Sequence, residues 1–255
     1  MSNICEINNL TFAYQTGKEI LSNISFSVTQ GEIVGILGKN GCGKSTLLNI
    51  ITGFLPARSG SLFINGKNIK EYKNIERAQT ISYIQQNKIS IPSYYCVEDY
   101  IIEGCRPFRP FGFYTKDDYN LLDKVMKACN LQTYKSRLIK ELSGGEVQRC
   151  IFAKAIMKQS NFFLFDEPCS AMDIKYQQEF FKIAHNVKKS LNAGIILTIH
   201  DINLAVNNCD RLIVLEAGNI IYDGEARLVT SEIIASAFDI QVSDQCTKGK
   251  YFFYQ

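Results

Sequence analysis

A glycine-rich turn between an apolar run and a helical pattern constrains this chain more than any other feature. Residues 33–37 predict a buried strand, and the apolar spacing of residues 47–51 predicts a helix. Between them stands GKNGCGKST, from Gly38 to Thr46. Glycines permit a tight turn whose N–H groups point inward at a helix N-terminus, where anions are favoured. The spacing matches the P-loop pattern, so the sequence predicts a site for a nucleoside triphosphate.

Two side chains in this loop have expected roles. Lys44 would reach the outer phosphates as a point charge, and the Ser45 hydroxyl would coordinate a magnesium ion. The plainer alternative is a glycine-rich turn that precedes an amphipathic helix. The position between a predicted strand and a predicted helix favours the nucleotide site over that alternative.

Composition excludes several classes of function. The net charge of +3 comes from 28 basic and 25 acidic residues that are dispersed, so neither a nucleic-acid footprint nor a basic membrane anchor is expected. Nine cysteines without metal-ligand spacing favour free thiols in a reducing compartment. The start of the chain does not resemble a signal peptide, and no run approaches the roughly 20 apolar residues of a membrane span. A membrane role would therefore need a partner.

Two further buried strands are predicted to end in polar side chains. Residues 162–165 are followed by Asp166 and Glu167, and residues 194–199 by His200. Functional groups in open α/β sheets gather beyond the carboxyl ends of strands. We therefore expect these side chains near a magnesium ion and a water molecule. Alternating residues 24–29 predict a half-buried antiparallel strand instead.

The middle of the chain predicts a helical insertion into the α/β core. Thr115 and Asp118 fit a capping box at the start of a helix with one apolar face. Further on, Ser143 can cap another helix, where Gly144 and Gly145 expose backbone N–H groups. From the residues alone, this is either a second phosphate site or a well-capped helix.

Five motifs together are more specific than any one of them. GKNGCGKST, Gln86, LSGGE, FFLFDEP and His200 occur in the order and placement of the ATP-binding-cassette (ABC) ATPases, which the chain resembles over nearly its whole length. The resemblance implies one ABC domain over residues 1–255, with a RecA-like α/β core and an antiparallel β subdomain in residues 1–86 and 161–240. A helical subdomain with the signature motif would occupy residues 87–160. The active form would be a head-to-tail pair of cassettes enclosing two ATP molecules.

The resemblance also implies a role for each motif residue. Glu167 would be the general base for water, His200 the γ-phosphate sensor, and Gln86 the contact to magnesium, water and the transmembrane partner, while Lys44 would stabilise the phosphates. Magnesium would be held by Ser45, Gln86 and Asp166. Residues implied to contact ATP are Tyr14 (adenine stacking), Gly38, Asn40, Gly41, Gly43, Lys44, Ser45, Thr46, Ser143, Gly144, Gly145 and Asp173.

Residues 97–118 and 218–240 resemble importer ATPases for iron–siderophore, haem and cobalamin uptake. By that resemblance the chain would hydrolyse ATP at the cytoplasmic face of the plasma membrane, bound to permease subunits and served indirectly by an external substrate-binding protein. Two alternatives stay open: an importer ATPase for another substrate such as zinc or manganese, and a soluble cassette for iron–sulfur cluster assembly.

Overall fold

The computed structural model describes residues 4–14, 17–85, 91–92, 94–109, 111–170, 173–247 and 250–254. Within them the largest sheet has six strands in the order β10-β9-β3-β8-β7-β6. These strands are β3 (Ile33–Leu37), β6 (Ile81–Ile84), β7 (Phe162–Phe165), β8 (Gly194–Thr198), β9 (Arg211–Glu216) and β10 (Asn219–Glu225). All neighbours in it are parallel except β9 and β10, which form an antiparallel hairpin.

Side chains of this sheet are buried on both of its faces. Ile33 and Leu37 of β3 belong to one hydrophobic cluster, whereas Val34 and Ile36 belong to another. Because both faces are covered, the parallel strands are continuously apolar instead of alternating. The prediction of buried parallel strands before Asp166 and before His200 is thus confirmed.

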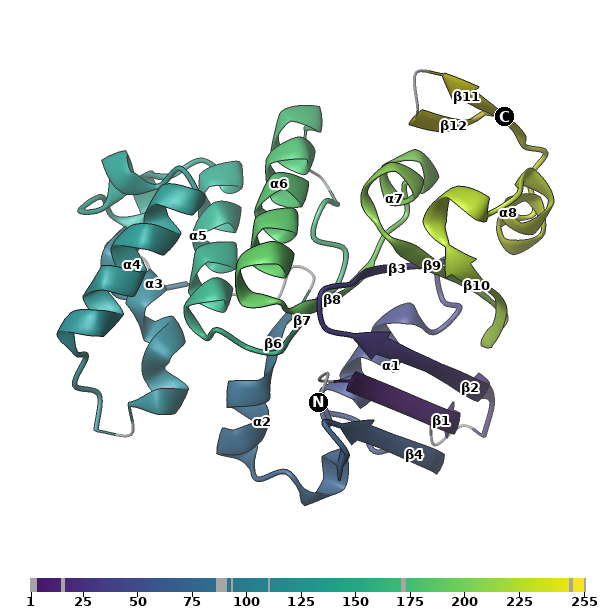
Figure 1. Ribbon diagram of the computed structural model, residues 1–255, viewed down its shortest axis with the longest axis horizontal. Coiled ribbons are helices and arrows are strands. Elements are labelled where there is room, and N and C mark those ends of the chain that lie inside the picture. The colour runs from purple at the N-terminus through teal and green to yellow at the C-terminus, as the bar shows by residue number, and fades with distance from the viewer. Residues whose placement is uncertain are drawn as a thin grey trace.

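A second sheet, antiparallel, lies against one of these faces. It has the order β2-β1-β4-β5 and consists of β1 (Ile4–Ala13), β2 (Glu19–Thr29), β4 (Ser59–Ile64) and β5 (Lys67–Asn68). Burial along β2 alternates, as expected for a strand with one face in the core. Helix α1 (Lys44–Ile51) lies between the two sheets, and its buried apolar side chains belong to the same hydrophobic cluster as side chains of both sheets. In Figure 1 this helix is seen below the central sheet.

Helices cover the other face and extend to one side. The helices are α2 (Asn74–Thr80), α3 (Val97–Ile102), α4 (Lys116–Ala128), α5 (Gly144–Met157), α6 (Ile174–Leu191), α7 (Ile202–Asn208) and α8 (Ser231–Phe238). In Figure 1, α3, α4 and α5 form a group at the left, and α6, α7 and α8 lie above the sheet. This is the α/β fold with an antiparallel sheet and a helical insertion that was predicted.

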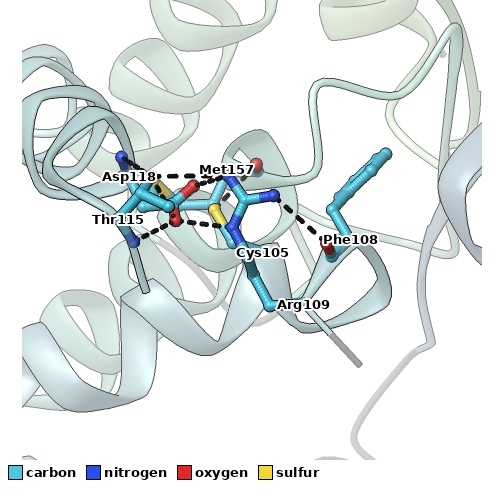
Figure 2. A network of polar contacts seen from close by, with 6 residues as sticks. All are labelled: Cys105, Phe108, Arg109, Thr115, Asp118 and Met157. Atoms are coloured by element: carbon cyan, nitrogen blue, oxygen red, sulfur yellow. Dashed lines mark hydrogen bonds and ion pairs between the residues drawn. The ribbon is translucent and has the colours of Figure 1, made fainter. Parts of the chain in front are cut away.

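The predicted capping box at the start of α4 is present and is part of a larger polar network. Thr115 Oγ1 accepts a hydrogen bond from the Asp118 amide at 3.3 Å, and Asp118 Oδ2 accepts one from the Thr115 amide at 2.7 Å. Figure 2 shows Arg109 completing the network, since its Nε and Nη2 donate to the same carboxylate at 2.8 and 2.9 Å. Asp118 is buried, so this ion pair fixes the chain segment that leads into α4.

The C-terminal hairpin was not predicted. Strands β11 (Ser243–Thr247) and β12 (Lys250–Tyr254) pair with each other, and β12 lies against α7. Asn203 and Asn207 of α7 each exchange two hydrogen bonds with the backbone of β12, at Phe253 and Tyr251. Four residues of helix and two of strand both advance about 6–7 Å, so the two amides match the strand spacing.

The cysteines behave as expected. Cys5, Cys42, Cys96, Cys105, Cys129, Cys150, Cys169 and Cys209 are free thiols. Among the described residues no group of histidine, cysteine, aspartate and glutamate side chains could hold a metal ion by itself. Within the same part of the chain, no helix is long and apolar enough to cross a membrane.

Candidate nucleotide-binding site

The glycine-rich loop connects β3 to α1 and requires glycine at its first position. The φ angles of Gly38, Gly41 and Gly43 are 149°, 81° and 109°. A Cβ atom at Gly38 would lie 2.4 Å from the carbonyl oxygen of Leu215, so a side chain there would collide with the backbone of β9. The loop therefore passes close to the sheet and turns directly into the N-terminus of α1.

Lys44 is the first residue of α1 and its side chain folds back under the loop. Its Nζ donates hydrogen bonds to the carbonyl oxygens of Gly38 at 2.7 Å and Lys39 at 3.0 Å, and the residue is only 5% exposed. Burial lowers the pKa of Lys44, while the nearby Cys42, Glu167 and Asp166 oppose that shift. The ammonium is thus held at the centre of the loop, where the outer phosphates of a nucleotide would meet it.

An open pocket lies above this loop and contains most of the predicted nucleotide contacts. Its lining is formed by Tyr14, Ile20, Asn40, Gly41, Gly43, Lys44, Ser45, Thr46 and Glu167. Tyr14 is 48% exposed, and its hydroxyl is 3.3 Å from Thr46 Oγ1. An exposed ring beside a phosphate-binding loop is suited to stacking on a base. The pocket therefore has a place for both ends of a nucleotide.

Asp166 directly follows β7, and its carboxylate is hydrogen bonded both to the glycine-rich loop and to the neighbouring strand β8. It is 5% exposed, and its Oδ1 accepts hydrogen bonds from Ser45 Oγ at 3.0 Å and Thr198 Oγ1 at 2.8 Å. Hydroxyl groups do not neutralise a buried carboxylate, so this position suits a cation. Carboxylate and hydroxyl oxygens are ligands that Mg²⁺ prefers. Ser45 and Asp166 thus fit the magnesium site expected there; the third expected ligand, Gln86, lies outside the described residues.

Glu167 is held in a restricted backbone conformation beside the pocket. Its φ is 50°, an unusual value for a residue other than glycine. Its amide donates to Thr198 Oγ1 at 2.8 Å, and its Oε1 is hydrogen bonded to Nε2 of His200. The Glu167 side chain is 15% exposed and that of His200 36%. The carboxylate is therefore oriented by His200 and the backbone by Thr198.

Thr198 is a site residue that the sequence analysis missed. It is completely buried and bonds both Asp166 and the amide of Glu167, so one hydroxyl connects the two carboxylate residues. The available signal was a polar residue at the end of the apolar run GIILT of β8.

The structure places the remaining predicted ATP contacts in a different region. Ser143 caps α5, since its Oγ accepts from the Glu146 amide at 3.4 Å, and both Ser143 and Gly144 are exposed. Asp173 caps α6 by accepting a hydrogen bond from the Tyr176 amide at 2.9 Å. Ser143, Gly144, Gly145 and Asp173 are not part of the pocket around Lys44.

Hydrolysis of a nucleoside triphosphate needs charge neutralisation around the phosphates and a positioned base for water. The loop around Lys44 is suited to the first need, and the oriented carboxylate of Glu167 is suited to the second. The fold and the site together define the class of P-loop nucleoside triphosphatases.

Comparison with known proteins identifies the family. The family model described as "ABC transporter" matches residues 21–170. An uncharacterised ABC transporter ATP-binding protein of Methanocaldococcus jannaschii is 35% identical over 246 residues, covering 96% of this chain and 95% of that protein. A petrobactin import ATP-binding protein of Bacillus anthracis is 30% identical over 252 residues, covering 97% of this chain and 91% of that protein.

Among solved structures, one described as "an inward-facing conformation of a putative metal-chelate type ABC transporter" is similar, with a TM-score of 0.84 and 28% sequence identity. The match covers 100% of this chain and 96% of that one. The chain belongs to the ABC transporter family. It is an ATP-binding ATPase subunit, as the resemblance stated above led us to expect.

Proposed function

We propose that this chain is the ATP-hydrolysing subunit of an importer for a metal chelate, of the iron–siderophore, haem or cobalamin type. The observation that carries the proposal is similarity over the whole chain to a transporter described as metal-chelate type. In this chain Lys44 and Glu167 line one pocket, Asp166 is hydrogen bonded to Ser45 of that pocket, and His200 is hydrogen bonded to Glu167. A relative named for petrobactin import supports the same class of substrate. The chain would act at the cytoplasmic face of the plasma membrane, attached to permease subunits.

Each site residue has a role in ATP binding or hydrolysis in this proposal. Lys44 and the amides of the loop bind the β- and γ-phosphates and stabilise the charge that develops during transfer. Glu167 orients a water molecule and accepts its proton, and His200 keeps that carboxylate in place. Ser45, Asp166 and Gln86 would hold Mg²⁺, which supplies charge neutralisation. Tyr14 would stack on the adenine.

The position of the signature residues supports a paired arrangement. Ser143, Gly144 and Asp173 are exposed and are absent from the lining of the chain's own pocket. In our proposal, they act on the nucleotide of a second copy, so that two ATP molecules lie between two chains. Hydrolysis would then control how the two copies separate, and this movement would drive the permease.

The test is purification of the tagged chain from its own host after mild solubilisation of the membranes, with mass spectrometry of the proteins that copurify. The proposal predicts a polytopic permease and, bound to it from outside, a substrate-binding protein. A Glu167→Gln variant, which we expect to hold the ATP-bound state, serves as a second bait. Recovery of soluble iron–sulfur assembly proteins in place of a permease would contradict the transport function and leave the ATPase chemistry intact.

A further inference from the structure

Gly145, the second glycine of the signature motif, lies directly against the ring of Tyr176. A Cβ atom at Gly145 would be 2.6 Å from Cζ, 2.7 Å from Cε1 and 2.8 Å from Cε2 of that ring. A Cβ atom at Gly144, by contrast, would have no atom within 4 Å. Neither glycine has a positive φ angle. The Tyr176 ring therefore explains why residue 145 lacks a side chain, whereas no neighbour among the residues that the structure describes explains it for residue 144.

Tyr176 is itself held from two directions. Its backbone amide donates to Asp173 Oδ1 at 2.9 Å in the cap of α6. The guanidinium carbon of Arg149, one turn after Gly145 on α5, lies 5.7 Å from the centre of its ring. Arg149 also reaches α6, because its Nη1 is 3.4 Å from Oε2 of Glu179. The cap thus holds the backbone of Tyr176 at the start of α6, and its ring lies beside Gly145 and Arg149 of α5.

We propose that Tyr176 is a positioning residue that fixes the signature turn relative to Asp173. This inference rests on the proposed paired arrangement, in which both motifs face the nucleotide of the second copy. A ring pressed against Gly145 sets how closely the first turns of α5 and α6 approach each other. Gly144 and Asp173 therefore present their backbone and side-chain groups at a constant separation. Gly145 is glycine to accommodate this ring, and Gly144 is glycine to leave room for the phosphate.

The first test is a double-mutant cycle on thermal unfolding, using Gly145→Ala and Tyr176→Leu. The leucine side chain is shorter than that of tyrosine and has no atoms corresponding to Cε1, Cε2 and Cζ, which are the ring atoms nearest Gly145. We expect Gly145→Ala to lower the midpoint of unfolding by about 3 °C or more in the wild-type background, because of overpacking. In the Tyr176→Leu background the same change should leave the midpoint unchanged or raise it, since alanine favours a helix more than glycine does. An equal loss in both backgrounds would overturn the inference.

The second test is steady-state ATPase activity of the same four proteins. Gly145→Ala should lower kcat about tenfold or more, with KM for ATP within about twofold, because the chain's own loop is untouched. Adding Tyr176→Leu should return kcat to within about threefold of the Tyr176→Leu single variant. Recovery of the unfolding midpoint without recovery of kcat would also overturn the inference, because Gly145 would then be required for a reason other than the ring.

Gly144→Ala is the matched control. It should leave the unfolding midpoint unchanged or higher, lower kcat, and show no recovery with Tyr176→Leu, because no atom of the described residues lies within 4 Å of its Cβ position. Full ATPase activity of Gly144→Ala would contradict the paired arrangement under Proposed function. The Gly145–Tyr176 cycle would still decide whether the ring restricts residue 145, so the two failures are distinguishable.

Discussion

The imidazole of His200 and the carboxylate of Glu167 are hydrogen bonded to each other although 33 positions separate them in the chain. They meet because β7 and β8 are parallel neighbours, with Phe165 paired to Leu197, and both residues follow the carboxyl ends of these strands. The sheet thus determines which way the carboxylate points. A base oriented before the nucleotide arrives needs no reorganisation during the reaction.

Replacing this base tests its role. Glu167→Gln keeps the shape of the side chain but cannot accept a proton, so we expect kcat for ATP hydrolysis to fall about 10²- to 10⁴-fold. ATP affinity, measured at equilibrium by fluorescence of a labelled analogue, should change less than about threefold, because Lys44 and the loop are intact. An ATPase rate equal to that of the wild-type protein would show that Glu167 is not the base.

Thr198 gives a second test, of a residue that contacts both carboxylate positions. Thr198→Val removes the hydroxyl without changing the volume, so the hydrogen bond from the Glu167 amide is lost and Asp166 loses one donor. A buried unsatisfied group costs about 1–3 kcal/mol. We expect lower stability in urea and a kcat reduced about tenfold or more. Thr198→Ser retains the hydroxyl and should behave like wild type; equal activity of the valine and serine variants would refute this role.

Two substitutions of Tyr14 separate the contribution of ring stacking to nucleotide affinity from that of the hydroxyl group. Tyr14→Phe loses only the contact of the hydroxyl with Thr46, whereas Tyr14→Ala loses the ring. Stacking of an aromatic ring on a base contributes about 1–3 kcal/mol, so the alanine variant should bind ATP roughly five- to 150-fold more weakly. The phenylalanine variant should bind nearly as well as wild type. Titration of both with a fluorescent nucleotide decides this, and equal affinities for the two variants would exclude stacking.

Asp118 provides a stability prediction away from the nucleotide. Burial would raise the pKa of this carboxyl, but hydrogen bonds from Arg109 and Thr115 outweigh it and lower the pKa to about 2. Asp118→Asn removes the buried partner of a partly exposed ion pair and leaves Arg109, whose side chain is 31% exposed, without this counter-charge (Figure 2). We expect a loss of about 1–3 kcal/mol in the free energy of unfolding at pH 7. The exposed neighbour provides the control, since Asp117→Asn should change stability by less than about 0.5 kcal/mol.

The pH dependence of this loss has a defined sign. Because the folded-state pKa of Asp118 lies below the ordinary aspartate value of 3.8, its charge stabilises the native state above about pH 4. That stabilisation is lost as pH falls towards about 2. The difference in unfolding free energy between wild type and Asp118→Asn, measured by urea titration, should therefore shrink between pH 5 and pH 3. A difference that stays constant over that range would show that the ion pair contributes nothing.

The sequence predicted the site best where a motif is compatible with few backbone conformations. The loop from Gly38 to Thr46 was identified because its glycines, Lys44 and Ser45 match a backbone conformation that few other sequences adopt. Buried parallel strands followed by Asp166 and His200 were recognisable because continuous apolar runs end in polar residues there.

Contacts between distant segments were not recognisable in this way. Thr198 was missed because a threonine in a strand is ordinary. Its role depends on Asp166 and the Glu167 amide, which directly follow the end of the adjacent strand β7. The hairpin β11–β12 was missed because its stability comes from Asn203 and Asn207 of α7 rather than from its own sequence. The contact between Gly145 and Tyr176 likewise depends on how two helices pack.

The most direct test of the proposed function is uptake of a radiolabelled metal by intact cells of the host, supplied as an iron–siderophore complex, as haem or as cobalamin. The chromosomal gene would encode either the wild-type chain or Glu167→Gln, with membrane levels of the chain matched between strains. We predict that wild-type cells accumulate label from at least one chelate and that the variant reduces this accumulation to the level of a gene deletion. Equal uptake of every chelate by the two strains, with ATPase activity lost in the variant, would contradict metal-chelate import as the function of this ATPase.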